Sequence, residues 1–406
     1  MYKRQGPGFI NFFLGTEFYS AVIREILANP EAYGRSEYGR DEKVMVEFVS
    51  ANPTGPMHMG NARGGALGDC LAAVLDKAGY NAWREFYVND AGNQIEKFGC
   101  SLEARYLQIF KGDEIEFPED GYQGEDIKDL AKEYADLNGD SLVNVSAEER
   151  KKTLVDYALP KNIKKMQADM EKYKIYYDKW FFESELHKSG AVKAVVDLLT
   201  KKGLTYEKEG AVWYKNKEVL TQKLLKEGKS QKYIDNLELK DDVLIRQNGN
   251  PTYFTADIAY HKNKFDRGFT TLIDVWGADH HGHVMRMKGA MDAIGYDGDK
   301  LNVVLMQLVK LVKDGELVRM SKRTGKAIQL GDLLDEVPVD SARFLFNTKE
   351  ANTQMDFDLD LAVSQDNQNP VYYVQYAHAR ICSIFKSLAK AVSYTHLRAH
   401  ETTLHL

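Results

Sequence analysis

The most constraining feature of the sequence is a unit near residue 50 in which a strand, a turn and a helix follow one another. Residues 44–49 are almost continuously apolar, as in a strand covered on both faces of a parallel sheet. A turn rich in proline and glycine follows at 52–56, and from about residue 61 apolar residues recur at helical spacing until Gly79. A second strand at 82–88 completes one βαβ unit. This order predicts an open α/β nucleotide-binding fold.

The rest of the chain divides by pattern. Residues 125–200 have a helical pattern with alternating charge, and short strand-like pieces occur at 211–214 and 243–245. The α/β pattern returns at 272–277 and 303–306, and the chain becomes helical again from about residue 332. We therefore expect a Rossmann-like parallel sheet interrupted by a helical insertion at about 115–250.

Composition excludes several classes of protein. Hydrophobic residues make up 44% and charged residues 28%, which is typical of folded domains. The net charge of −6 argues against a polycationic nucleic-acid binder, although a local basic groove stays possible. No apolar run is long enough for a membrane span, and the N-terminus lacks the apolar core of a signal peptide. Three cysteines are too few for disulfide bonds to stabilise a fold of this size. We expect a cytoplasmic protein.

Both ends of the sequence look foreign. Residues 1–5 and 392–406 match the translated ends of a transposase-type sequencing adapter; a natural basic tail is the alternative. We interpret both as adapter-derived, which leaves 6–391 as the natural segment.

The turn at 52–61 carries the first candidate site. Its small residues, among them Pro53, Gly55 and Gly60, allow a nucleotide to approach the backbone closely, and the following helix N-terminus favours phosphate. His58 and Asn61 can both donate hydrogen bonds to phosphate. A purely structural turn is the alternative.

A second candidate site lies some 260 residues downstream. Residues 319–326 hold four cations with a serine and a glycine, a composition that suits a mobile phosphate clamp or, equally, a solvated charge run.

Together these segments resemble the HIGH and KMSKS signatures of class I aminoacyl-tRNA synthetases, and more narrowly the bacterial arginyl-tRNA synthetases. The most specific stretches are 46–56, 86–92, 253–260 and 320–326. The resemblance implies a class I catalytic Rossmann domain at 41–365. It also implies a remnant of an N-terminal tRNA-binding domain and linker at 6–40 and the first helix of a helical anticodon-binding domain at 366–391. An apolar face of that helix would be exposed, and we expect this chain to charge tRNA weakly or not at all.

The resemblance also implies the reaction. Such enzymes activate L-arginine with ATP and Mg²⁺ to arginyl-adenylate and transfer it to the 2′-hydroxyl of the terminal adenosine of tRNA(Arg). The implied catalytic residues are His58, Asn61 and Lys322, with Met320 and Ser321 also at the ATP. Two positions depart from the signatures, because Asn61 replaces a histidine and Arg319 replaces a lysine. We expect a monomer.

An arginine pocket is implied by five residues. Tyr253 and Asp257, four residues apart, would share one helical face, where Asp257 binds the guanidinium group. Glu47, an acid inside a buried strand, would contact arginine or form an internal ion pair, for instance with Arg84. Asn52 would hold the α-amino or carboxylate group. Asp90 would line the pocket, with a turn or helix cap as the alternative.

The stretch 277–283 contains three histidines and an acid. Zinc binding is one interpretation, and a packed turn another. The resemblance favours substrate or ATP contact, with His281 as the substrate-binding residue and no metal held by the protein. Two rival functions are a nucleotidyltransferase of coenzyme synthesis, which would be much shorter, and an inactive or RNA-binding relative.

Overall fold

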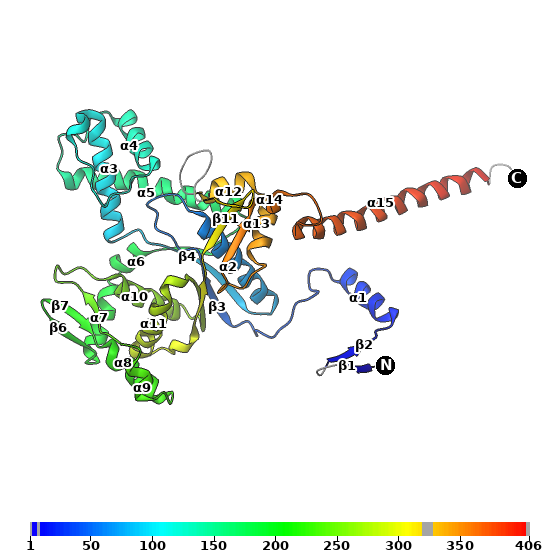
Figure 1. Ribbon diagram of the computed structural model, residues 1–406, viewed down its shortest axis with the longest axis horizontal. Coiled ribbons are helices and arrows are strands. Elements are labelled where there is room, and N and C mark those ends of the chain that lie inside the picture. The colour runs from blue at the N-terminus through cyan, green and yellow to red at the C-terminus, as the bar shows by residue number, and fades with distance from the viewer. Residues whose placement is uncertain (1, 6–8, 319–327, 403–406) are drawn as a thin grey trace.

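The computed structural model describes residues 2–5, 9–318 and 328–402, and the side chains of 10–112, 114–318 and 328–391. Two lobes flank a central sheet, and a long C-terminal helix extends away from them (Figure 1). Among the described residues, no helix is both long and apolar enough to cross a membrane.

A parallel sheet lies at the centre. Its strand order is β10-β9-β3-β4-β5, and every neighbouring pair is parallel. The strands are β3 Lys43–Glu47, β4 Asn81–Val88, β5 Lys179–Phe182, β9 Thr271–Gly277 and β10 Leu301–Met306. The strands expected at 44–49, 82–88, 272–277 and 303–306 are therefore confirmed, as is the Rossmann-like fold class.

The continuous apolar run of β3 is explained by burial on both faces. Met45 belongs to the core cluster that contains α10 (Tyr253–Asp266) and α11 (His281–Ile294), whereas Val46 belongs to the cluster that contains α2 (Met59–Lys77). Since strand residues alternate between faces, Glu47 points to the same side as Met45, toward α10.

Helix α2 lies unusually close to β3. A Cβ atom on Gly68 would lie 2.2 Å from the ring of Phe48, so this glycine allows the contact. Close contact fixes the helix N-terminus next to the carboxyl ends of the strands, where α/β folds bind ligands.

The expected insertion is divided by β5, a strand of the central sheet. Before β5, α3 Asn93–Lys111, η1 Gly112–Glu114, α4 Glu125–Asn138 and α5 Ala147–Lys172 form a helical lobe with its own core. After β5 come α6 Glu183–Lys188, α7 Ala191–Lys201, β6 Thr205–Lys208, β7 Ala211–Tyr214, α8 Asn216–Lys226, α9 Gln231–Asp235 and β8 Asp242–Ile245. Strands β6, β7 and β8 form a separate antiparallel sheet, so this second part is not purely helical.

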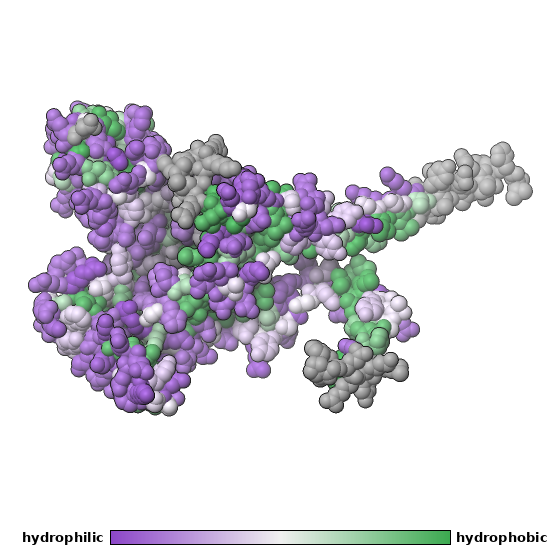
Figure 2. Space-filling view, viewed as in Figure 1, coloured by the Kyte–Doolittle hydropathy of each residue, from purple (hydrophilic) through white to green (hydrophobic). Residues whose placement is uncertain are grey.

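The remaining elements lie between β9 and β10, after the central sheet or before it. They are η2 Ala278–His280, η3 Gly298–Lys300, β11 Val309–Lys313, β12 Glu316–Val318, α12 Leu330–Glu336, α13 Val339–Phe346, β13 Met355–Asp358, α14 Leu359–Val363 and α15 Pro370–Thr402; at the start of the chain lie β1 Tyr2–Gln5, β2 Phe9–Phe12 and α1 Thr16–Ala28. Large hydrophobic side chains are exposed along α1 and α15 (Figure 2). Such surfaces are typical of contact sites between domains or proteins.

Candidate functional site

His58 begins helix α2 and closes its first turn. Its Nδ1 accepts the backbone N–H of Gly60 at 3.1 Å, while the side-chain oxygen of Asn61 accepts the backbone N–H of His58 at 3.0 Å. This reciprocal arrangement is a capping box. Because Nδ1 accepts, the ring proton lies on Nε2, and the amide NH₂ of Asn61 is left as a donor. Both donors that the sequence predicts are thus held in fixed positions.

The environment of His58 favours a neutral ring. The residue is exposed, and desolvation by the protein around its ring lowers its pKa from the ordinary 6.5. A Cβ atom on residue 60 would lie 2.9 Å from the ring, so glycine is needed there to keep the ring folded over the helix start.

A cavity of about 680 Å³ opens beside His58 at the carboxyl ends of β3, β9 and β10. Gly60 and Asn61 line it on one side. Gly277, Asp279 and His280 line it on another. Its position and size suit a nucleotide.

The second motif adjoins the same cavity through its flanks. Met320, Ser321 and Lys322 lie outside the described residues, as does Arg319. Val318 before them and Ile328 after them both line the cavity. The backbone after the motif pairs with the first motif: His58 and Gln329 form an antiparallel bridge, and Met59 donates its N–H to the carbonyl of Ile328 at 3.2 Å. The fold therefore brings the described residues on either side of the second motif to the first motif.

Tyr253 and Asp257 share the first turns of α10, as the sequence predicts. Asp257 Oδ2 lies 3.1 Å from Nε2 of His283, and the Asp257 side chain is 35% exposed. Tyr253 is also partly exposed and lines a cavity of about 510 Å³. This cavity lies between α3, α6 and α10, in the opening between the two lobes (Figure 2).

Glu183, which the sequence analysis missed, lines the same cavity. It is 3% exposed and accepts a hydrogen bond from the hydroxyl of Tyr87 at 2.8 Å. Burial raises its pKa, and the contacts with Tyr87 and His187 only partly oppose this effect. Its one sequence signal is an acid directly after a short aromatic strand. Asp257 does not line this cavity, but its charge also raises the pKa of Glu183, so the two carboxylates lie close enough to act on one cation.

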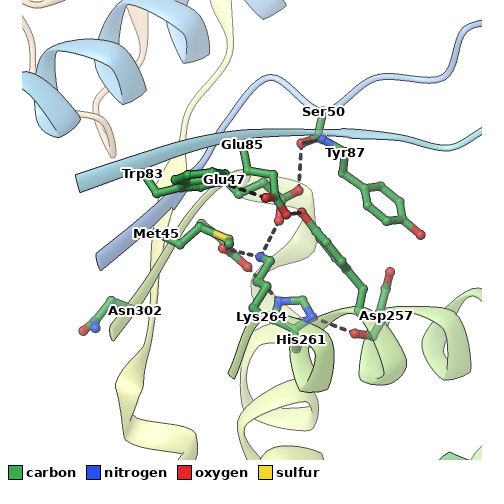
Figure 3. A network of polar contacts seen from close by, with 12 residues as sticks. Met45, Glu47, Ser50, Trp83, Glu85, Tyr87, Asp257, His261, Lys264 and Asn302 are labelled. Atoms are coloured by element: carbon green, nitrogen blue, oxygen red, sulfur yellow. Dashed lines mark hydrogen bonds and ion pairs between the residues drawn. The ribbon is translucent and has the colours of Figure 1, made fainter. Parts of the chain in front are cut away.

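Glu47 is paired within the protein, as the alternative interpretation holds, but with Lys264 rather than Arg84. Lys264 Nζ lies 2.5 Å from Glu47 Oε2, and Ser50 donates to Oε1 at 2.7 Å (Figure 3). Arg84 instead pairs with Asp69. The premise of an unpaired carboxylate is therefore wrong, and contact between Glu47 and a substrate stays a prediction.

The other expected residues are distributed around the site. Asp90 accepts the backbone N–H of Ser184 at 2.8 Å in the first turn of α6, and its place in the substrate pocket stays a prediction. Asn52 and Gly55 line a smaller cavity of about 350 Å³ next to His58. Pro53 is buried, and its carbonyl accepts from Asn162.

His281 lies apart from these groups. It lines a cavity with Lys223 and Asp242 on the α8 side of α11, whereas His280 faces the nucleotide cavity and His283 contacts Asp257. Within the described residues, no group of three or more His, Cys, Asp or Glu side chains is placed to hold a metal ion.

The fold is that of a class I aminoacyl-tRNA synthetase catalytic domain. The family model described as "tRNA synthetases class I (R), catalytic domain" matches residues 22–381, and the chain belongs to this family of arginyl-tRNA synthetases. Arginine–tRNA ligases from Ruminiclostridium cellulolyticum and Caldanaerobacter subterraneus are 58% and 59% identical to it over 94% of the chain. The chain spans 65% of the length of these relatives.

Solved structures are similar to this chain in fold. A putative arginyl-tRNA synthetase from Campylobacter jejuni has a TM-score of 0.79 and 37% identity, over 92% of this chain and 78% of that one. The Thermus thermophilus arginyl-tRNA synthetase, at 21% identity, shares the fold with a TM-score of 0.66 over 95% of this chain and 71% of its own.

Proposed function

We propose that this chain carries the amino-acid-activating site of an arginine–tRNA ligase. The reaction is ATP-dependent formation of arginyl-adenylate, followed by transfer of the arginyl group to the 2′-hydroxyl of the terminal adenosine of tRNA(Arg). One observation carries the proposal: the carboxylate of Glu183 lines a pocket at the start of α10, where the charge of Asp257 acts on it, and a separate cavity suited to a nucleotide begins at the capped N-terminus of α2.

In the first step, the carboxylate of arginine attacks the α-phosphorus of ATP in line and pyrophosphate leaves. The protein contributes positioning and charge stabilisation. Nε2–H of His58 and the amide of Asn61 donate to the phosphate oxygens as negative charge develops. Lys322, in one segment with Met320 and Ser321, closes over the β- and γ-phosphates. Mg²⁺ enters with ATP, and none of the chain's residues is assigned to hold it.

Selection of arginine rests on charge. The guanidinium group has five donors in a planar fork, and carboxylates are its best acceptors. Asp257 and Glu183 take the fork, and Tyr253 stacks on it or donates to it. His283 holds Asp257 in place. Asn52 and Glu47 contact the α-amino end, Asp90 orients α6, and His281 contacts the substrate from a separate cavity.

The partners follow from this assignment. L-arginine, ATP and tRNA(Arg) are the proposed substrates, and the protein acts in the cytoplasm as a monomer. The proposed domain boundaries stay those of the sequence analysis, with the catalytic domain at 41–365 and the start of an anticodon-binding domain at 366–391.

Calorimetric titration with L-arginine tests the proposal, with L-citrulline and L-lysine as controls. Citrulline keeps the shape of arginine but lacks the charge, so it should bind at least about tenfold more weakly if charged hydrogen bonds select the ligand. Equal affinity for arginine and citrulline, or no arginine binding by a sample with a cooperative melting transition, would contradict the proposal.

A further inference from the structure

Three acidic side chains lie side by side in the centre of the sheet. Glu47 is paired in register with Glu85 on β4 and with Asp274 on β9. Glu47 is 7% exposed, and the other two are fully buried. Buried carboxylates are costly unless cations and hydrogen bonds compensate them, so their partners determine what this row can do.

Cations from the α10 side meet this row (Figure 3). Lys264 bridges Glu47 at 2.5 Å and Asp274 at 2.8 Å, and Arg267 forms two hydrogen bonds with Glu85. Lys264 is fully buried, so the bridge is shielded from solvent. Helix α10, whose first turns carry Tyr253 and Asp257, is therefore held against β3 by a charged contact.

The contact continues from Glu47 to the backbone. Ser50 donates to Glu47 Oε1 at 2.7 Å and accepts the N–H of Tyr87 at 3.1 Å. Val49 and Ser50 adopt left-handed conformations, with φ of 72° and 36°. Such conformations are unfavourable for residues other than glycine, above all for a β-branched one, and persist only where surrounding contacts hold them. The turn leads directly to Asn52 and the His58 loop.

We propose that Lys264 is a positioning residue for the amino-acid pocket: by bridging Glu47 and Asp274 it fixes Glu47 and, through Ser50, the left-handed turn that carries Asn52 into the site. The role rests on the proposed function and extends it. Each carboxylate oxygen of Glu47 has a further lone pair, so the held side chain can still accept a hydrogen bond from a substrate ammonium group.

Two variants and one matched control test the proposal. Lys264→Met with Asp274→Asn removes one charge of each sign from the cluster and leaves Glu47 without its lysine. Ser50→Ala removes only the last link and leaves the buried ion pair intact. Tyr260→Phe is the control, because its hydroxyl donates to Glu85, the neighbouring acid of the same row, and not to Glu47.

Two readouts are made on the full 406-residue chain. The Kd for L-arginine should rise about tenfold in the double variant and in Ser50→Ala, and stay within about twofold in Tyr260→Phe, as expected for loss of one hydrogen bond that orients a binding group. Hydrogen exchange at the Tyr87 amide should become faster in the double variant, although Ser50 is present, and stay slow in the control.

A folded double variant with wild-type arginine affinity and a protected Tyr87 amide would overturn the proposal. If the double variant does not fold, wild-type affinity in Ser50→Ala overturns it instead. Equal weakening of arginine binding by Tyr260→Phe would also contradict the proposal, because the row of acidic side chains would then affect binding only through the stability of the fold. Absence of arginine binding in the wild type would defeat the proposed function, and the Tyr87 exchange would still decide whether Lys264 holds the turn.

Discussion

His58 and Gln329 pair through their backbones in an isolated antiparallel bridge, although His58 caps helix α2 and Gln329 follows the second motif, 271 residues later in the chain. Leu330 adds a hydrogen bond from its N–H to the carbonyl of Met57 at 2.8 Å. The segment after the second motif is therefore hydrogen-bonded directly to the turn that caps α2. In the proposed reaction, the first motif and the second motif both contribute donors to the phosphates of one ATP.

Asp257 should determine selectivity between arginine and citrulline. Asp257→Asn replaces a charge-assisted acceptor with a neutral one, so we expect arginine affinity to fall roughly 10- to 100-fold and citrulline affinity to change little. Calorimetry on both ligands measures this. Asp266→Asn, on the same helix but bonded to Lys262, is the matched control and should leave both affinities unchanged. Parallel loss for both ligands would place Asp257 outside the guanidinium contact.

Glu183 should release a proton when arginine binds. Burial raises the pKa of Glu183 in the free protein, and a guanidinium cation beside it would lower that pKa again. Proton release should therefore grow as the pH falls toward the raised pKa. Titration of arginine in two buffers of different ionisation enthalpy measures the released protons, and Glu183→Gln should abolish the difference between buffers. The same difference in that variant would assign the proton elsewhere.

His58 should titrate below the ordinary histidine value of 6.5. The folded state disfavours the cation, whereas the unfolded chain takes up the proton near 6.5. The contribution of His58 to stability is therefore present above pH 6.5 and is lost as the pH falls toward the lowered folded pKa. Protonation would also remove the Nδ1 acceptor that holds Gly60. NMR titration of the His58 ring measures the pKa, and a value above 6.5 would contradict the cap geometry.

Two glycines on α2 should respond in opposite directions to alanine. A Cβ atom at residue 68 would lie 2.2 Å from the buried ring of Phe48, so Gly68→Ala should destabilise the fold by about 1–3 kcal/mol through overpacking. A Cβ atom at Gly64 would meet only Met306, at 3.6 Å, so Gly64→Ala should be neutral or stabilise by up to about 1 kcal/mol. Chemical denaturation of both variants checks the pair, and equal effects would argue against the close contact of α2 with β3.

The sequence by itself determined the elements that depend on local pattern. The apolar run of β3, the small-residue turn, the helix expected from about residue 61 and the four-residue spacing of Tyr253 and Asp257 are all local signals, and each is confirmed. The motifs were sufficient to identify the family, because their residue types and order are themselves the signal.

Only the tertiary structure decided which groups meet. Lys264 and Glu47 are 217 residues apart, and the sequence pattern of α10 contains nothing that selects Glu47 and Asp274 over other acids. Glu183 becomes a pocket residue only because β5 joins the sheet next to β4, inside a stretch that reads as an insertion. A charge inside a core is tolerated only with a partner, and partners are set by strand order and helix packing, which local periodicity does not encode.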